Sequence, residues 1–419
     1  MKFFLKLAIL SLLFFNCSKD NYNEQEEIDE VSENVKVYKP NLFEDSYVFA
    51  IENGGTKSYL LNKQGFKVKE WIFEKNLGND VEILPNGKLL GMFKSQNTSF
   101  NFGGYGGVIK ILNIDGSVDW EYEISSVSYL AHHDLEQLPN GNIVCLVWER
   151  IPMTTAVQLG VNATSDIFTE KIIEVNPANN QIIWEWRSID HIIQDDNLSA
   201  STYGSLDQNP QLININYNNV ANGDYMHANG IEYDPIKDVL FVSVNFYSEV
   251  WVIDHSTSTS QAASHIGGNY NKGGDLIYRF GNPETYNNVG QRLFYNNHCP
   301  ILINDNLPGE KNMLVYGNGS NISQSTVYEF LLPNVFNLTP NVNNEPDIVW
   351  SFTDANLFNE RISGAVRLKN GNTLIAEGDY GFWEVTPNNE IAWKYNDTPG
   401  YWRCYGYAKD SQQIQALGL

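Results

Sequence analysis

Basic residues are scarce in this chain. Its 419 residues contain 27 lysines and arginines against 50 aspartates and glutamates, which gives a formal net charge of −23 at pH 7. A protein that binds nucleic acid or an anionic membrane surface by charge needs the opposite balance, so these partners are excluded. An excess of negative charge is instead typical of a surface that keeps a protein soluble.

Cysteine is also rare, with four residues in the chain. Cys17 follows directly on an apolar run with a basic start, MKFFLKLAILSLLFFNC, which is too short to span a membrane as a finished helix. The run predicts a signal peptide over 1–16 and resembles a bacterial lipoprotein signal. Lipidation of Cys17 would then anchor the protein to a bacterial membrane, on the periplasmic side or at the cell surface; ordinary secretion is the alternative.

The remaining cysteines, Cys145, Cys299 and Cys404, are too few for a disulfide framework. They allow at most one bridge, and the sequence does not select the pair. After Cys17 the stretch SKDNYNEQEEIDEVSEN is polar and acidic, which predicts a flexible tether over 17–40. Apolar residues make up 42% of the whole chain, so the rest, 41–419, is expected to be globular.

Long apolar patterns with the period of a helix are missing, so very little helix is expected. The chain contains instead a unit that recurs six times, with an Asn-Gly hairpin turn in its best copies and an aromatic-bearing strand later on. The turns are clearest in ILPNGKLLG (83–91), QLPNGNIVCLVW (137–148) and RLKNGNTLIAEG (367–378). Six such units predict an all-β fold, a six-bladed β-propeller. A β-sandwich is the rival fold, but it does not explain six similar units.

Histidine occurs only seven times, so its placement is informative. His132 and His133, His227, and His298 each lie at the front of a predicted inner strand, ahead of a hairpin turn. A propeller gathers the starts of its inner strands around one channel, so these histidines are expected to share a site. The other three lie in turns or insertions and are expected at the surface: His191, His255 and His265.

A single histidine is usually a hydrogen-bonded structural residue, whereas three at similar positions favour chemistry. Three imidazoles suit zinc or another metal. They equally suit nucleophilic and acid–base work on an anionic group. The residue types alone leave both readings open.

Three motifs taken together are more specific: HHDLEQLPNGN, then HANGIEYDP…LFVSV…VWVIDH, then GDLIYRFGNP…QRLFYNNHCPILI. In order and spacing they resemble the bacterial arylsulfate sulfotransferases, over residues ~40 to 400. The resemblance implies a six-bladed propeller that moves a sulfuryl group from a phenolic sulfate ester to another phenol. It implies a ping-pong reaction through a sulfohistidine, without the nucleotide sulfate donor PAPS and without a cofactor or metal.

Carried over by position, His298 matches the family's nucleophile, while His133 and His227 match histidines that contact the transferring group or the leaving oxygen. Asn245 stands where familiar members carry an arginine. Asn229 belongs to the same H-x-N motif as His227. Aromatic side chains suit a flat phenolic substrate, and the candidates are Tyr225, Phe246, Tyr295 and Trp383.

The departure at Asn245 removes a positive charge from the expected site, because asparagine donates hydrogen bonds but carries none. Four arginines are possible replacements: Arg279, Arg361, Arg367 and Arg403. The family's extra N-terminal β domain is also missing, so a monomer is expected. Two alternatives stay open, namely a catalytically silent cell-surface propeller that binds glycan or protein, and a metal-assisted reaction on the same histidines.

Overall fold

The computed structural model describes residues 30–398 and 400–419. The expected signal peptide and Cys17 lie outside these residues. Strands form almost all of the regular structure, as predicted, and the α-helices of the described residues are short: α1 (Met153–Gln158), α2 (Thr259–Ala262) and α3 (Gln412–Leu417). No helix within 30–398 or 400–419 is long and apolar enough to cross a membrane.

Three sheets are four-stranded antiparallel meanders of the expected kind. One contains β27 (Tyr401–Ala408), β2 (Ser46–Glu52), β3 (Lys57–Leu61) and β4 (Lys67–Ile72). Another contains β15 (Ala228–Asp234), β16 (Val239–Val244), β17 (Glu249–Asp254) and β18 (Tyr278–Phe280). A third contains β19 (Asn297–Leu302), β20 (Met313–Gly317), β21 (Thr326–Leu331) and β22 (Asp347–Phe352).

The other strands form larger sheets, so the prediction of six separate four-stranded blades is not met in that form. An eight-stranded sheet contains β5 (Leu77–Ile83), β6 (Leu89–Lys94), β7 (Gly107–Leu112), β8 (Val118–Glu123), β9 (Tyr129–Gln137), β10 (Ile143–Ile151), β11 (Ile167–Asn176) and β12 (Gln181–Arg187). Its two meanders meet at one parallel bridge between Asn79 and His133. The fold is all-β and propeller-like.

The fifth large sheet contains β23 (Gly364–Arg367), β24 (Thr373–Glu377), β25 (Gly381–Val385), β26 (Ile391–Asn396) and β1 (Val35–Tyr38). The tether predicted over 17–40 is therefore wrong for its last part, because β1 pairs with the edge of β26. An edge strand presents free backbone N–H and C=O groups, and VKVY alternates in a way that suits this pairing. A short parallel pair, β13 (Ile192–Ile193) with β14 (Ile213–Asn214), lies in an insertion.

The predicted Asn-Gly hairpins are present at their expected places. Gly87, Gly141 and Gly371 have φ values of 80°, 84° and 91°, which L side chains adopt only with strain. These turns connect β5 to β6, β9 to β10 and β23 to β24. Asn-Gly there sets the register of each hairpin, and with it the position of the residues at the start of each inner strand.

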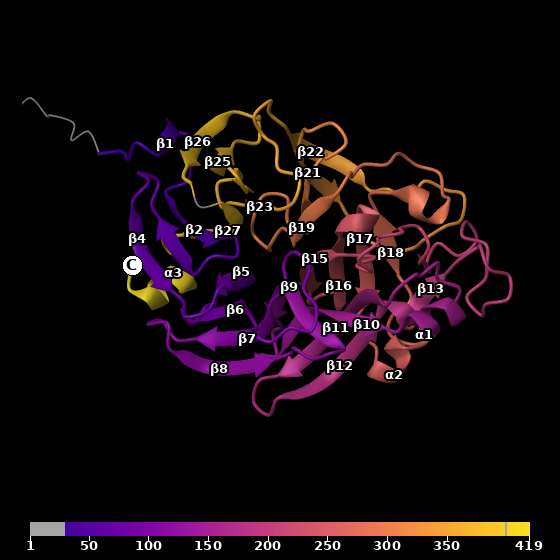
Figure 1. Cartoon of the computed structure of the whole chain (residues 1–419). Coiled ribbons are helices and arrows are strands. Elements are labelled where there is room, and N and C mark those ends of the chain that lie inside the picture. Colours follow the sequence, from indigo (N-terminus) through magenta and orange to yellow (C-terminus); the bar gives the residue numbers. More distant parts are fainter. Residues whose placement is uncertain (1–29, 399) are drawn as a thin grey trace, which may run out of the picture.

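Figure 1 shows strands β5, β9, β15, β19, β23 and β27 facing the middle of the molecule, with the later strands of each meander outside them. Segments far apart in the sequence thereby meet, since β27 near the C-terminus pairs with β2 near the N-terminus. Between the sheets the core is apolar and rich in aromatic rings, including Trp251, Trp383 and Trp393. This arrangement brings the predicted site residues to the centre.

Candidate active site

The backbone is irregular at the start of the inner strands, and this irregularity sets the direction of the histidine side chains. The register of β9 on β10 shifts between His132 and Leu135, so His133 and Asp134 form a bulge, and His133 has a φ of 53°. His227, directly before β15, has a φ of 54°. A non-glycine residue in the left-handed region costs on the order of 1 kcal/mol, and such outliers gather at functional sites. Bulges are also a common device for redirecting a side chain next to an active site.

His133 and His227 line one cavity of about 510 Å³. Their ring centroids lie 4.8 Å apart, nearly perpendicular to each other. Polar and charged groups complete much of the wall, among them Asn79, Arg361 and Asp379. The cavity is large enough for a phenolic sulfate and offers imidazole nitrogens for it.

His133 is held through a chain of hydrogen bonds that ends at a buried carboxyl group. Its Nδ1 lies 2.9 Å from Nδ1 of His132, whose Nε2 lies 3.0 Å from Oε2 of Glu170. Burial lowers the pKa of both histidines well below the ordinary value and raises that of Glu170 well above it. These shifts favour a neutral carboxylic acid at Glu170 and neutral imidazoles at His132 and His133 in the resting protein.

His227 is in a different state because Nδ1 hydrogen-bonds to Asp224 Oδ2. Burial lowers the pKa of His227, whereas the charge of Asp224, its hydrogen bond and the nearby Glu170 raise it, and the net shift is upward. Phe246 stacks on the ring at 4.7 Å between centroids and fixes its plane. This shift favours the imidazolium form of His227, which would place a positive charge at the cavity wall.

His298 lies beside the cavity but is not among the residues that line it. Its Nδ1 is 2.7 Å from Oδ1 of Asn318, whose Nδ2 donates to the carbonyls of Asn359 and Ile362. With its amide orientation fixed in this way, Asn318 accepts from Nδ1–H and leaves the lone pair on Nε2. Burial lowers the pKa of His298 to about 3, although Asn318 and, more weakly, the Arg361 carbonyl raise it. His298 is a neutral imidazole, the form that acts as a nucleophile.

Trp402 of β27 connects the histidines. Its ring centroid is 5.7 Å from that of His133 and 5.8 Å from that of His298. The residue is 2% exposed and lines the cavity, and its indole N–H has no hydrogen-bond partner among the residues that the structure describes. An orphaned buried donor costs about 1–3 kcal/mol, so its place at a cavity wall favours a ligand acceptor there.

The predicted substrate-binding residues divide into two groups. Phe246 and Asn245 line the cavity, although the amide of Asn245 already bonds the Asn297 carbonyl and Asn296. Asn229 also bonds the Asn297 carbonyl and is fully buried. Outside the cavity wall lie the aromatic candidates Tyr225, Tyr295 and Trp383, of which Tyr225 and Trp383 are packed in the core.

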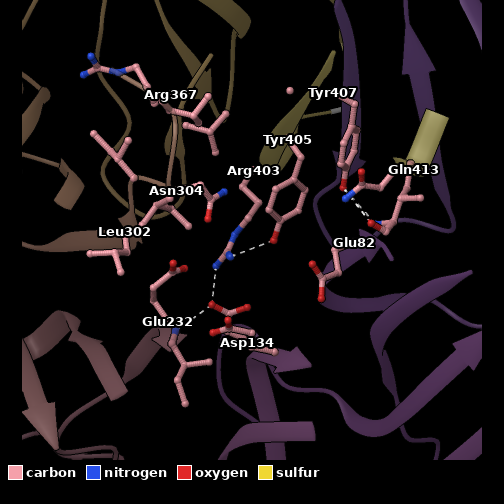
Figure 2. A pocket seen from close by; sticks show the side chains of 18 of the residues that line it. Glu82, Asp134, Glu232, Leu302, Asn304, Arg367, Arg403, Tyr405, Tyr407 and Gln413 are labelled. Atoms are coloured by element: carbon pink, nitrogen blue, oxygen red, sulfur yellow. Dashed lines mark hydrogen bonds and ion pairs between the residues drawn. The ribbon is translucent and has the colours of Figure 1, made fainter. Parts of the chain in front are cut away.

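Of the four arginines considered as replacements, Arg361 alone lines the cavity, with its side chain 79% exposed. Arg279 pairs with buried Glu249, and Arg367 pairs with Glu329. Arg403 points into a second cavity of about 300 Å³, where it bonds Asp134 at 2.9 Å and Tyr405 (Figure 2). These three charges are therefore neutralised elsewhere.

Sequence reasoning missed Glu170, Asp224, Asn318 and Trp402. None belongs to the motifs around the histidines, and each comes from a different part of the chain. Glu170, Asn318 and Trp402 meet the histidines only because distant strands become neighbours, so the sequence offered no local pattern for them. Asp224 lies three residues before His227, and this spacing was a local signal that could have found it. The three remaining cysteines, Cys145, Cys299 and Cys404, are free and buried, so no bridge joins them.

Comparison with known proteins agrees with this picture. The model of the family described as Arylsulfotransferase (ASST) matches residues 22–397. None of the curated proteins matches the chain. A solved structure of a protein of unknown function from Bacteroides caccae has a TM-score of 0.50 at 13% identity, covering 87% of this chain and 99% of its own. One from Desulfotomaculum acetoxidans DSM 771, also functionally unknown, has a TM-score of 0.44 at 9% identity, covering 86% and 99%.

The likeness to the Bacteroides caccae structure concerns the fold alone. The family match extends over most of the sequence, including every histidine of the site. It implies arylsulfotransferase-type activity on phenolic substrates in general. The chain belongs to the arylsulfotransferase (ASST) family.

Proposed function

We propose that this protein transfers a sulfuryl group from a phenolic sulfate ester to a second phenol through a sulfohistidine on His298, independently of PAPS. The observation that carries the proposal is that three neighbouring histidines have different hydrogen-bond partners. His298 Nδ1 faces the Asn318 amide oxygen, His133 Nδ1 faces His132, and His227 Nδ1 faces the Asp224 carboxylate. These partners and burial shift the pKa of His298 and His133 downward and that of His227 upward. A nucleophile, a proton carrier and a fixed positive charge are what this transfer requires.

In the first half-reaction, His298 Nε2 attacks sulfur and the bond from sulfur to the phenolic oxygen breaks. The leaving phenolate takes a proton. In the second half-reaction an acceptor phenol loses its proton, its oxygen attacks sulfur, and the bond from nitrogen to sulfur breaks. Atoms and charge balance over the cycle, and no further reactant is needed.

His227 takes over the electrostatic role left open at Asn245. Its imidazolium supplies a positive charge and an N–H donor in the cavity that Asn245 also lines, and Arg361 adds a second charge at the wall. The free indole N–H of Trp402 is available for a sulfuryl oxygen. Preorganised donors of this kind each contribute roughly 100- to 1000-fold in rate.

His133 gives its proton to the leaving oxygen and is reprotonated from Glu170 through His132. A protonated Glu170 donates to His132 Nε2, so His132 Nδ1–H donates to His133 Nδ1, and His133 presents Nε2–H to the leaving oxygen. When that proton leaves, each proton in the chain shifts by one bond and the negative charge forms on Glu170. The Ala228 N–H, 2.8 Å from Glu170 Oε1, stabilises it. The acceptor phenol reverses the shift.

Attack by His298 also requires access to sulfur. The segment 359–362, which accepts two hydrogen bonds from Asn318, and Trp402, which contacts the ring of His298, line the cavity, whereas His298 does not. A displacement of either opens the path. Substrate binding is expected to supply it.

The test is incubation of the purified protein with nitrophenyl sulfate and no acceptor, followed by intact mass and peptide mapping. We expect one added sulfuryl group on His298, lost on addition of phenol, and none in His298→Ala. A group mapped to His133 or another residue would overturn the assignment of His298. Absence of any adduct and of nitrophenol release over a panel of aryl sulfates would favour the silent binding propeller. Two features support that alternative: His298 is buried, and Asn245 stands in place of the family arginine.

Two further proposals concern the chain as a whole. We infer that the eight-stranded sheet represents two of the repeated units, because a single parallel bridge joins its halves; an experimental structure checks the count of six. We also propose a lipid anchor on Cys17 in the bacterial cell envelope, based on the apolar run before it. Cys17→Ala should release the protein from the membrane fraction, and unchanged fractionation would contradict the anchor.

A further inference from the structure

A second group of histidines lies outside the proposed active site. His191 belongs to the short 3-10 turn Ser188–His191 after β12, and His265 follows α2. Asp275, shortly before β18, lies between them, with Oδ1 2.8 Å from His191 Nδ1 and 2.7 Å from His265 Nδ1. The three ligand atoms all lie within 4.8 Å of one another. Two insertions of the propeller-like body thus meet at one point.

His191 is not the surface residue that its place in an insertion predicts. It is fully buried, and Trp186 stacks on its ring with an angle of 2° between the planes. The indole N–H of Trp186 in turn donates to the Gly274 carbonyl at 2.7 Å. Gly274 packs against the imidazole so closely that a Cβ there would lie 2.4 Å from Nε2. The ring is therefore held in one orientation before any ligand binds.

The two ring nitrogens of His191 both face acceptors. Nε2 lies 2.7 Å from the Ala262 carbonyl, and Nδ1 faces the Asp275 carboxylate. A neutral imidazole carries a single N–H, so donation to Ala262 leaves a lone pair on Nδ1 directed at a carboxylate oxygen. A cation between the two atoms removes this repulsion. A ligating histidine whose other N–H donates to a backbone carbonyl is the usual supporting arrangement in metal sites.

We propose that His191, His265 and Asp275 bind a zinc ion whose fourth position is open to water. Two imidazole nitrogens and one carboxylate oxygen form a ligand set that zinc favours. A tetrahedral ion with bonds of ~2.0–2.1 Å separates its ligand atoms by about 3.3 Å, so Asp275 Oδ1 needs to move by about half an ångström on binding. The exposed ring of His265, 63% accessible, leaves a path for the ion.

Such an ion would connect the insertion after β12 to the loop between β17 and β18. Both segments are long and lie outside the regular meanders. The site is therefore expected to stabilise these insertions and not to take part in sulfuryl transfer. Stabilisation by a bound ion grows with its free concentration relative to the dissociation constant.

The experiment uses the mature protein without a histidine tag, dialysed against chelator and then titrated with Zn²⁺ in competition with a chromophoric chelator. We expect one zinc ion per chain and a higher melting temperature in its presence. His265→Ala is the principal variant, because an exposed residue is removed with little effect on folding. It should lower the zinc affinity at least tenfold and abolish the thermal shift.

His255→Ala is the matched control, because His255 also lies between two carboxylates, Asp238 and Glu174, but on opposite sides of its ring. It should bind zinc like the parent protein. His227→Ala tests the alternative that zinc occupies the proposed active site, and it should likewise retain the ion. Zinc binding unchanged in His265→Ala, or lost in His227→Ala, or absent from the parent protein, would overturn the proposal; Asp275 would then be only a hydrogen-bond partner of His191 and His265.

Discussion

At the scale of single residues, the hydrogen-bond partners of His133, His227 and His298 make these three histidines chemically different. Asp224 favours the charged form of His227, Asn318 fixes which nitrogen of His298 carries the proton, and His132 connects His133 to Glu170. The histidines alone therefore do not define the site. The partners decide which ring attacks, which carries a proton and which carries charge.

The charge of His227 is tested by Asp224→Asn. Loss of the carboxylate leaves burial as the dominant influence, so the pKa of His227 falls instead of rising. Activity that needs the imidazolium disappears as pH rises through that pKa, and the alkaline limb of kcat/KM should move to lower pH. At pH 7.5 we expect a loss on the order of 100-fold. Asp238→Asn, which faces His255 outside the site, is the control; an identical profile in both variants would contradict the assigned role.

The proton chain is tested by Glu170→Gln. The glutamine still accepts from Ala228 N–H and donates to His132, so the fold and the orientation of His133 are retained, but it does not take up the negative charge. Phenols that are poor leaving groups need the proton most, and their sulfates should slow by roughly 100-fold or more. Nitrophenyl sulfate, with a good leaving group, should be affected much less. Equal slowing of all donors would rule out the relay.

At the scale of elements, the site depends on irregular backbone at the start of the inner strands. His133 lies on a bulge of β9. Gly104, a loop residue with a φ of 77°, packs against its ring. A Cβ on Gly104 would lie 2.0 Å from His133 Nε2. The loop and the bulge are therefore fitted to each other, and the histidine occupies the position that glycine leaves free.

Gly104→Ala should consequently displace His133 and abolish most of the activity. Its backbone strain costs about 1 kcal/mol in unfolding free energy in addition. Gly116→Ala separates the two effects, because Gly116 has a similar φ of 86° and nothing within 4 Å of a Cβ. That variant should lose similar stability by chemical denaturation and keep its sulfuryl-transfer rate. Full activity in Gly104→Ala would show that His133 is dispensable.

The elements also show what the sequence could predict. The Asn-Gly turns have a local physical cause, so the hairpins at 83–91, 137–148 and 367–378 were found in advance, and the histidines ahead of them reached the centre. The edge pairing of β1 and the bridge between Asn79 and His133 depend on tertiary contact and have no such pattern. The same reason explains why Glu170 and Asn318 were missed.

At the scale of the whole molecule, a chain with a large excess of negative charge carries carboxyl groups along its central channel. Glu82 and Glu232 line the cavity that contains Arg403 and Asp134 (Figure 2). Burial raises the pKa of each to about 8, and neighbouring carboxylates add to the shift while Arg403 opposes it. The single guanidinium of Arg403 does not neutralise all of these carboxyl groups. Protonation of Glu82 and Glu232 therefore lowers the cost of burying them in the folded protein.

The stability of the fold should therefore fall as pH rises from about 6.5 to about 8. A raised carboxyl pKa in the folded chain means that it binds protons there which the unfolded chain has already released, so ionisation destabilises it. The pKa values of His227 and His255 are also raised, so their deprotonation likewise lowers the unfolding free energy as pH rises. Below about 6.5 the buried histidines with lowered pKa values, His133 and His298, act in the opposite direction and obscure the effect.

Glu82→Gln isolates the contribution of one carboxyl group to this slope. The amide does not ionise, so the decline in unfolding free energy between pH 6.5 and 8 should become shallower, by at most about 1.4 kcal/mol per pH unit. Urea unfolding at several pH values in this window measures it, with Glu360→Gln, an exposed glutamate at the other cavity, as the control. If the unfolding free energy of the parent protein and of Glu82→Gln declines equally with pH, the Glu82 carboxyl group is ionised throughout this window. Arg403 would then be the group that stabilises its negative charge.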